Sequence, residues 1–308
     1  MNLTRPHQVS TTRLVCLACL SFCILSISAV ADTRRVELEN GDIYEGDFVD
    51  GVRTGTGTYV WANGNAYQGD FLNNQMHGEG TYRWTDGRTY IGSFIADKRN
   101  GRGTLTWLIG NSYEGDFVQD EMHGQGVFRW INEDRYEGDF VHGARTGHGQ
   151  FDWATGERFE GNFVDGDKDG RGTFEWPNGN RYYGDFAEDQ RNGLGIFYWR
   201  DGTIYRGQFR RDKMHGHGVK QQPDGPMELQ RWDDGNLALN EPLEQNARCR
   251  LEIQNRAWMF DSDTCVNGLA HGRGLAASLD GELIIVDGRF VLGHVVEGDR
   301  QSLKLGDS

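Results

Sequence analysis

The sequence predicts an all-β protein: an elongated, single-layer array of stacked β-hairpins with a small β cap at its C-terminal end. A 23-residue unit recurs eight times without insertion or deletion between Tyr44 and about Gly225. Aromatic residues and glycines alternate within the unit, and glycine-containing turn signals separate the alternating runs. A fixed period of roughly 20–50 residues is typical of repeat arrays, and strict alternation is typical of strands.

Each copy carries the same residues at the same offsets. A glycine stands two residues after the start of a copy, a phenylalanine four residues after it, and a G-x-G pair follows later. The copies begin at Tyr44, Tyr67, Tyr90, Tyr113, Tyr136, Phe159, Tyr182 and Tyr205. Seven copies also carry a tryptophan, namely Trp61, Trp84, Trp107, Trp130, Trp153, Trp176 and Trp199.

A hairpin is expected over residues 57–71. Aromatics and glycines take alternate positions there, so they share one face of each strand. Asn63-Gly64 lies between the two runs, and Asn-Gly is a strong hairpin signal. A three-residue loop ending at Gly64 gives the pairs Tyr59–Tyr67 and Gly57–Gly69.

The glycines are expected to serve packing, because a backbone without Cβ lets an aromatic ring of the neighbouring hairpin lie flat against it. A lone hairpin is marginal in water, so each hairpin must be stabilised by the next. About three large aromatics per copy, each worth roughly 1.5–3 kcal/mol when buried, oppose the ordering cost of glycine-rich backbone. We therefore expect stability to come from nearest neighbours rather than from one globular core.

This pattern, Y-x-G-x-F followed by G-x-G-x-aromatic-x-W and Asn/Asp-Gly, resembles the MORN (membrane occupation and recognition nexus) repeat. The resemblance covers residues 44–227 in eight in-phase copies, with divergent terminal units. It implies a β-hairpin array that acts as an interaction platform. Phospholipid binding, protein scaffolding and self-association are the roles proposed in the family. Some members carry a kinase or methyltransferase domain, and this sequence shows none.

Residues 1–31 have the features of a bacterial signal peptide. Arg5 and Arg13 precede an apolar run, and an A-x-A site ends at Ala31. Cleavage there predicts a periplasmic or secreted protein; the alternative is an uncleaved segment that anchors the chain in the inner membrane. Loss of the two arginines changes the formal net charge from −14 to −16. So acidic a chain is not expected to bind nucleic acid, which requires a basic surface.

Incomplete units are expected to close both ends of the array. Residues 32–43 look like the back half of a unit and predict an N-terminal capping strand. Residues 228–246 contain a degenerate ninth copy and a polar linker. Residues 247–308 keep traces of the unit and are interpreted as a divergent pair of units, with a small separate β-domain as the alternative. Cys249 and Cys265 remain after cleavage, and an oxidising compartment predicts a disulfide between them.

Catalytic and metal-binding patterns are weak. G-x-S-x-G, H-E-x-x-H, Walker and C-x-x-C motifs are absent from the mature sequence, so we expect no enzymatic activity and no cofactor. Asp165, Asp167 and Asp169 open a D-x-D-x-D-G calcium loop, but Trp176 occupies the twelfth position, where a bidentate Glu belongs. We interpret them as an ordinary inter-hairpin loop, with calcium as the alternative. A turn-stabilising role before glycine is likewise preferred to a metal ladder for His77, His123 and His215.

Two surfaces are candidates for binding. Most aromatics are expected to form the core, and the rest to keep exposed edges along a groove. The candidate aromatic surface comprises Tyr44, Tyr67, Tyr90, Tyr113, Tyr136, Trp61, Trp84, Trp107, Trp130, Trp153 and Trp176. The opposite face carries acidic residues that form either ordinary solvated charge or a stripe for a basic partner: Glu45, Asp47, Asp70, Glu114, Asp116, Glu137, Asp139 and Asp185.

The sequence therefore favours a non-enzymatic scaffold that binds a protein partner in the periplasm or outside the cell. Two alternatives stay open. One is binding of a lipid or glycan of the cell envelope through exposed aromatics. The other is a structural module that associates with itself.

Overall fold

The computed structural model describes residues 32–243, 249–253, 256–261, 265–291 and 293–302. The predicted signal peptide and the last residues of the predicted linker, 244–246, lie outside this part of the chain. Cleavage after Ala31 and the localisation that follows from it therefore stay predictions. Within the described residues, no helix has the length and apolar character needed to cross a membrane.

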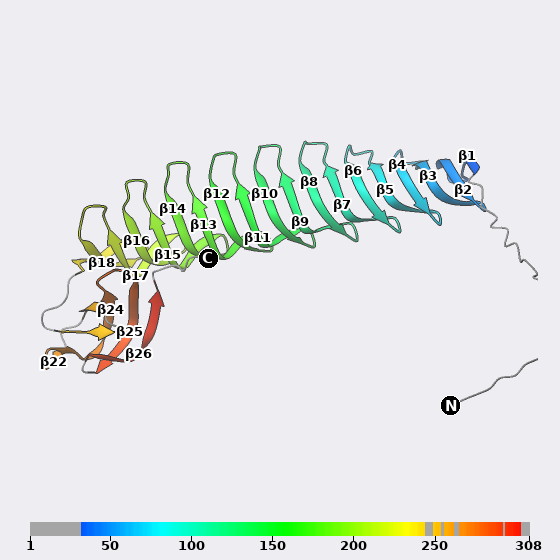
Figure 1. The fold of residues 1–308 in the computed structure, drawn as a ribbon. Coiled ribbons are helices and arrows are strands. Elements are labelled where there is room, and N and C mark those ends of the chain that lie inside the picture. Colours follow the sequence, from blue (N-terminus) through cyan, green and yellow to red (C-terminus); the bar gives the residue numbers. More distant parts are fainter. Residues whose placement is uncertain (1–31, 244–248, 254–255, 262–264, 292, 303–308) are drawn as a thin grey trace, which may run out of the picture.

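The described residues form 26 β-strands (Figure 1). The array contains β1 (Asp32–Glu37), β2 (Ile43–Val49), β3 (Val52–Val60), β4 (Ala66–Leu72), β5 (Gln75–Arg83), β6 (Thr89–Ile95), β7 (Lys98–Thr106), β8 (Ser112–Val118), β9 (Glu121–Arg129), β10 (Arg135–Val141), β11 (Ala144–Asp152), β12 (Arg158–Val164), β13 (Asp167–Glu175), β14 (Arg181–Ala187), β15 (Gln190–Tyr198), β16 (Ile204–Arg210), β17 (Lys213–Gln221), β18 (Met227–Asp233) and β19 (Asn236–Pro242). The C-terminal segment contains β20 (Glu252–Ile253), β21 (Arg256–Asp261), β22 (Cys265–Val266), β23 (Leu269–Ala270), β24 (Gly272–Ser278), β25 (Leu283–Val291) and β26 (His294–Ser302).

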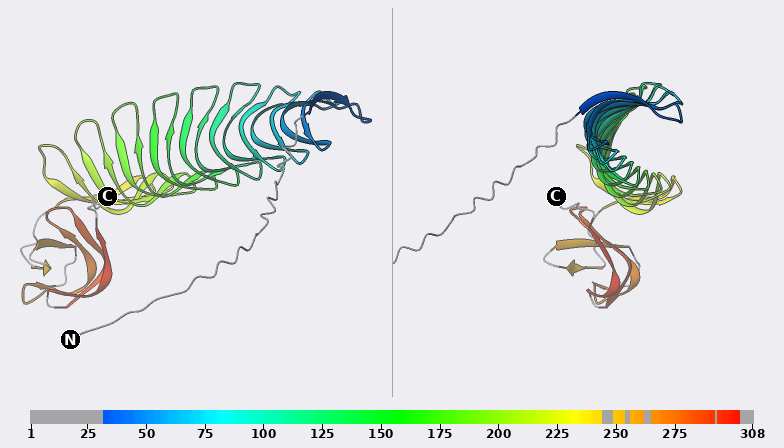
Figure 2. Two further views of the ribbon diagram at one scale, coloured as in Figure 1. Left: turned by 45° about the vertical axis from the view of Figure 1, so that its right-hand side comes forward. Right: turned by 90° about the vertical axis from the view of Figure 1, so that its right-hand side faces the viewer.

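Strands β1–β19 form one antiparallel sheet, in which each strand pairs with the next along the chain (Figure 1). The predicted all-β, single-layer array is confirmed. Within the eight copies, the even strands have seven residues and carry Y-x-G-x-F, with Phe159 in place of the tyrosine in β12, whereas the odd strands have nine residues and carry G-x-G. Figure 2 shows that the strands bend, so that the sheet has a C-shaped cross-section. The sequence did not predict this curvature.

The predicted hairpin forms between β3 and β4. Its loop is closed by two backbone hydrogen bonds: Trp61 N–H donates to Asn65 O at 3.0 Å, and Gly64 N–H donates to Trp61 O at 2.8 Å. Gly64 has a φ of +89°, which a residue without Cβ adopts freely. The predicted register is confirmed by the pairs Tyr59–Tyr67 and Gly57–Gly69.

A second kind of hairpin joins the opposite ends of the strands, where the sequence predicted inter-hairpin loops. Asp50 and Gly51 connect β2 to β3 with φ values of +50° and +82°, as in a tight type I′ turn. The chain therefore stays in the sheet at both ends of every copy. These tight turns replace the predicted inter-hairpin loops, and they explain why the sheet is continuous rather than a stack of separate hairpins.

Each copy also contains a β-bulge that the sequence analysis did not predict. In the first copy the pairs are Gly46–Gly57 and then Phe48–Arg53. Three residues of β3 thus stand opposite Asp47, whose Oδ2 accepts a hydrogen bond from Thr56 N–H at 2.9 Å. The carboxylate therefore satisfies a backbone donor that the bulge removes from the ladder. Four other copies repeat this bond through Asp70, Asp116, Asp139 and Asp185.

The tyrosine that begins a copy forms the core of the array. Tyr113 is 0% exposed, and its ring meets Phe117 of its own copy and Phe140 of the next edge to face, with centroids 5.2 and 5.0 Å apart. The ring lies over Gly126 of β9, where an added Cβ would come within 2.4 Å of it. The predicted packing role of the glycines is confirmed, and each ring is held between two copies.

These buried tyrosines predict an alkaline limit to stability. Burial raises the pKa of Tyr90 and Tyr136 to about 12, above the ordinary value of 10. A pKa that is higher in the folded state contributes stability that is complete below about pH 10 and is lost as the pH rises toward 12. We expect tyrosinate absorbance from these rings to appear only as the sheet unfolds, as followed by ultraviolet absorbance and circular dichroism. Their ionisation near pH 10 in an intact sheet would contradict the prediction.

The N-terminal end of the array is closed by β1. It pairs with β2 over its whole length, within the range predicted to cap the array. Arg34 of β1 lies over the ring of Phe48, with its guanidinium carbon 4.3 Å from the ring centroid. Since no earlier copy precedes Phe48, the arginine covers a ring that would otherwise be open on that side.

The C-terminal residues form a separate five-stranded sheet, β20-β21-β24-β25-β26, and the small pair β22–β23. Their register nevertheless repeats that of the array, because the pairs Gly272–Phe290 and Gly274–Gly288 reproduce Gly55–Phe71 and Gly57–Gly69. The segment thus combines a separate sheet with the trace of a repeat unit. The predicted disulfide between Cys249 and Cys265 is present, with Cα atoms 5.2 Å apart.

This C-terminal sheet packs against the last strands of the array (Figure 1). Val219 of β17 and Leu229 of β18 share one apolar cluster with Leu275, Ala277 and Ile284. All five side chains are buried. The array therefore ends on a folded cap rather than on an open apolar edge.

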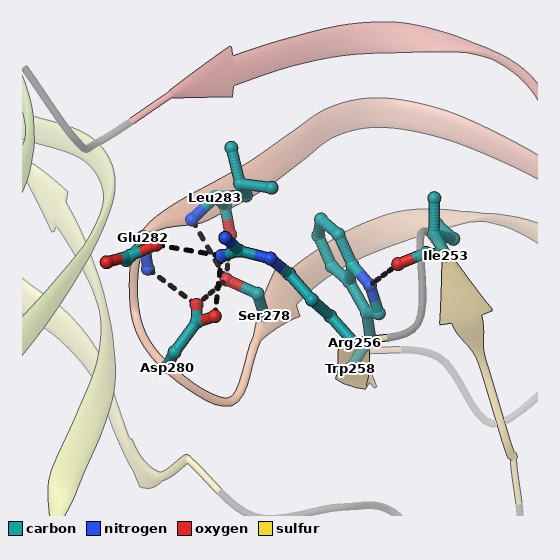
Figure 3. A network of polar contacts seen from close by, with 7 residues as sticks. All are labelled: Ile253, Arg256, Trp258, Ser278, Asp280, Glu282 and Leu283. Atoms are coloured by element: carbon teal, nitrogen blue, oxygen red, sulfur yellow. Dashed lines mark hydrogen bonds and ion pairs between the residues drawn. The ribbon is translucent and has the colours of Figure 1, made fainter. Parts of the chain in front are cut away.

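A polar network shapes the turn between β24 and β25 that docks on the array. Arg256 Nη1 donates to Asp280 Oδ2 at 2.5 Å and to Glu282 Oε2 at 2.9 Å (Figure 3). Gly281 lies between these two acids and faces Met227, and an added Cβ would stand 2.9 Å from Met227 Sδ. The arginine thus neutralises two acids on either side of the point where the turn meets β18.

Candidate binding surface

The five tyrosines of the predicted aromatic surface lie in the interior. Tyr44 is 1% exposed, and Tyr67, Tyr90, Tyr113 and Tyr136 are 0% exposed. They offer no surface to a ligand, because their rings are enclosed by the phenylalanines of two successive copies. This corrects their proposed place in a binding groove.

The tryptophans of that surface form a second stack beside the tyrosines. Trp130, for example, lies between Phe128 and Phe151, with ring centroids 4.4 and 5.2 Å away. All six are partly buried, so they keep only an edge toward solvent. Those six tryptophans are Trp61, Trp84, Trp107, Trp130, Trp153 and Trp176.

Cations clamp successive copies together on this aromatic face, a role that the sequence analysis missed. The guanidinium carbon of Arg99 lies 5.7 Å from the ring centroid of Tyr90 and 5.2 Å from that of Phe117 in the next copy. Its Nη2 donates to Asp120 O, in the turn of that next copy, at 2.6 Å. The recurring R-T-G and R-N-G triplets were the available signal. The same position holds Arg53, Arg145, Lys168 and Arg191 in other copies.

The calcium candidate is not assembled. Asp165 lies in the tight turn after β12, with a φ of +50°, whereas Asp167 and Asp169 lie in β13. Asp167 instead faces Asp189 of the next copy, which raises the pKa of the Asp167 carboxyl. Among the described residues these three carboxylates do not form a group able to share an ion.

One group of described residues does bring potential metal ligands within 4.8 Å of one another: His215, Asp233 and Asp234. Each is already engaged in holding the β18–β19 hairpin. Asp234 N–H donates to His215 Nδ1 at 3.3 Å, and Asp234 Oδ1 accepts from Arg210 Nη2 at 2.6 Å. The arrangement fits a structural ion-pair network better than a cation site.

The opposite, polar face of the array is hollowed along its axis. One hollow of about 410 Å³ extends over β5–β10 and is lined by Glu79, Ile91, Arg102, Glu114 and Glu137, among others. A second, of about 280 Å³, continues it over β9–β12 and shares Gln125 and Glu137 with the first. Backbone of the paired glycines Gly92, Gly103, Gly115 and Gly126 also lines the first hollow. We call this continuous hollow the polar groove.

The acidic residues of this face divide into two groups. The aspartates of the predicted stripe bind the bulge backbone, as described above, and so are partly committed to the fold. The glutamates Glu114, Glu137 and Glu160 instead point outward from β8, β10 and β12 at the same strand position, and all three are exposed. They are available to a partner.

An aliphatic row runs parallel to the glutamates on the same face. Within β8, Glu114 and Val118 alternate with the buried Tyr113 and Phe117, so the first two share the polar face. Val118 is 45% exposed. The equivalent residues Leu72, Ile95, Val141 and Val164 are 43%, 50%, 39% and 51% exposed. An exposed apolar row of this length is typical of interaction surfaces.

Solved structures of low similarity were found. The SAS-4 (dCPAP) TCP domain of Drosophila melanogaster, in complex with a proline-rich motif of Ana2, is 12% identical. The match covers 73% of this chain and 99% of that one, with a TM-score of 0.31. The CPAP G-box domain is 14% identical, with coverages of 66% and 100% and a TM-score of 0.35. Virginiamycin B lyase of Staphylococcus aureus is 9% identical, with coverages of 83% and 94% and a TM-score of 0.14. Such values support no inference about this chain.

Family comparison agrees with the repeat geometry. Among curated proteins, none matches the sequence significantly. The profile of the MORN repeat, in contrast, matches eight times: at residues 44–66, 67–87, 90–112, 113–135, 136–158, 159–181, 182–204 and 205–227. These matches coincide with the eight copies that the 23-residue period defines and cover more than half of the sequence. The chain belongs to the MORN repeat family.

Proposed function

We propose that this chain is a non-enzymatic scaffold that binds a protein partner along the polar groove, in the periplasm or outside the cell. The observation that carries the proposal is that the two faces of the sheet differ in how many of their side chains are free to contact a partner. The side chains of the aromatic face are occupied by contacts between successive copies. The polar face presents a continuous hollow with exposed acidic and aliphatic side chains.

Export is supported by two features of the chain. Strand β1 (Asp32–Glu37) lies beyond the predicted cleavage site at Ala31, so cleavage there would leave the described array whole. The C-terminal segment carries a disulfide between Cys249 and Cys265, and disulfides persist mainly in oxidising compartments.

Site-specific photo-cross-linking in the native cell envelope tests the proposal. A photoreactive residue at Ile91, which lines the polar groove and is 57% exposed, is expected to capture one abundant protein, identified by mass spectrometry. Leu108, 75% exposed at a hairpin turn outside the groove, is the matched control. Recovery of only self-adducts from Ile91 would favour a self-associating module, and lipid or glycan adducts would favour an envelope binder. Either result would overturn the proposal.

A further inference from the structure

We propose that the polar groove takes an extended, basic segment of the partner with a lysine or arginine at every third residue. Each cation would meet one of the successive glutamates Glu114, Glu137 and Glu160. The inference rests on the function proposed above, because it names the chemistry of the partner at that site. It follows from the spacing of the repeats, the charge of the groove and the aliphatic row beside it.

The spacing selects the conformation of the bound segment. The three glutamates lie on every second strand, β8, β10 and β12, and neighbouring strands are about 4.7–4.9 Å apart, so successive glutamates repeat about every 9.5 Å. A polyproline II segment has three residues per turn and a rise of about 3.1 Å, and therefore repeats about every 9.3 Å. One turn of such a segment matches one copy of the array, and every third side chain returns to the same side.

Other regular conformations do not match. In a β-strand, alternate residues face opposite sides, so side chains three apart point away from each other. An α-helix has a pitch of about 5.4 Å, so it completes a fractional number of turns per copy and its side chains lose register with the glutamates. An extended segment without internal hydrogen bonds also leaves its own backbone groups free to bond the polar side chains of the groove.

The charge of the groove selects cations. Five acidic side chains line the two hollows, namely Glu79, Glu114, Glu137, Asp139 and Glu160. Among the same lining residues, Arg102 is the one lysine or arginine. Glu137 and Glu160 also contact Arg135 and Arg158 of their own strands, but both side chains stay more than half exposed, at 56% and 55%. Two residues before Glu114, β8 has Ser112, where β10 and β12 have Arg135 and Arg158. We therefore expect Glu114 to contribute most to binding.

The aliphatic row selects the residues between the cations. Val118, Val141 and Val164 stand four residues after the three glutamates on the same strands and the same face, a separation of about 13 Å. Aspartates such as Asp116 and Asp139 stand between the two rows on the same face. A segment lying along the array over these aspartates would turn its cations toward the glutamates and its apolar residues toward the valines. The partner is thus a segment in which apolar or proline residues separate regularly spaced cations.

Synthetic peptides and the full-length protein test this inference. The probe is a fluorescent Lys-Pro-Ala-Lys-Pro-Ala-Lys peptide, and its matched control has the same composition with the three lysines adjacent. Fluorescence anisotropy is expected to show the period-three peptide binding about fivefold or more tightly, with an affinity that falls as salt rises, as for exposed charge pairs.

Charge-neutral variants locate the site. The triple variant Glu114→Gln, Glu137→Gln and Glu160→Gln is expected to bind the period-three peptide about tenfold more weakly. The control triple Glu121→Gln, Glu133→Gln and Glu188→Gln removes the same charge from exposed positions outside the polar groove. It is expected to change binding less than twofold.

The failures are distinguishable. Equal affinity for the two peptides, or equal loss in the two triple variants, would overturn the period-three inference by showing unspecific attraction to an acidic protein. The proposed function would then still be judged by cross-linking at Ile91. If that cross-link captures a partner through a segment without period-three cations, the inference fails while the scaffold function stands.

Discussion

The Gly126→Ala variant is expected to lose about 3 kcal/mol or more of folding free energy, because overpacking of a tight core forces its neighbours to move. The added Cβ would lie 2.4 Å from the ring and hydroxyl of Tyr113. That ring cannot retreat, since Phe117 and Phe140 enclose it from both sides. Thermal unfolding followed by circular dichroism measures the loss. Hydrogen exchange is expected to locate the new opening in the copies that flank β9, because repeat arrays depend on nearest neighbours.

Gly225→Ala is the matched control. Its backbone does not lie in the left-handed region, and the nearest atom to an added Cβ is Cβ of Gln222, 3.1 Å away. Gln222 is exposed and lies outside the strands, so the backbone there can adjust by the few tenths of an ångström that the contact requires. We expect the control to change the free energy of unfolding by less than about 1 kcal/mol. Equal effects of the two substitutions would show that the general cost of replacing a glycine, and not contact with the tyrosine ring, determines the loss of stability.

Tyr113→Ala is expected to destabilise the array by about 3–5 kcal/mol, the range for removal of a large buried aromatic. The substitution removes edge-to-face contacts with both Phe117 and Phe140 and leaves a cavity over Gly126 at the joint between two copies. Chemical denaturation is expected to show a lower midpoint, and the transition to separate into two parts if the array divides at this joint.

Tyr113→Phe separates the ring from its hydroxyl. The single hydroxyl proton is shared between two carbonyl oxygens, Asp116 O at 3.0 Å and His123 O at 3.3 Å, so loss of the hydroxyl is expected to cost about 1 kcal/mol. The sixth copy supports this estimate, because Phe159 occupies the equivalent position and packs on Gly172 in the same way. A loss as large as that of Tyr113→Ala would mean that the hydrogen bonds, rather than ring packing, hold the copies together.

The hairpins and their register were predictable because their determinants are local. Asn63-Gly64 specifies the turn, and alternation of glycines and aromatics specifies which side chains share a face. The glycine spacing then leaves one register in which rings meet bare backbone, as the pair Gly57–Gly69 shows. The disulfide was equally accessible, since Cys249 and Cys265 are the two cysteines beyond the signal segment.

The functional surface was less predictable because it depends on how neighbouring copies meet. The local sequence around a tyrosine is the same whether its ring is exposed or enclosed. The phenylalanine of the next copy determines whether the ring is buried. The bulge has the same kind of origin. The bulge turns aspartates such as Asp116 toward backbone donors. The acidic stripe in the sequence therefore contains two kinds of carboxylate: aspartates that bind the backbone and glutamates that are free to bind a partner. The inter-copy role of Arg99 likewise appears only when the next turn is in place.

The sequence by itself determined the repeat, the all-β fold, the register and the closure of both ends, because each copy interacts mainly with its immediate neighbours and carries the instructions for doing so. Only the tertiary structure decided which face is free to bind. Stacking buries the tyrosines and commits the cations, while the polar groove, lined by Glu114 and Glu137, stays open on the opposite face. The reason is that a side chain becomes buried only when neighbouring copies pack on it, and the sequence of a single copy does not show this packing.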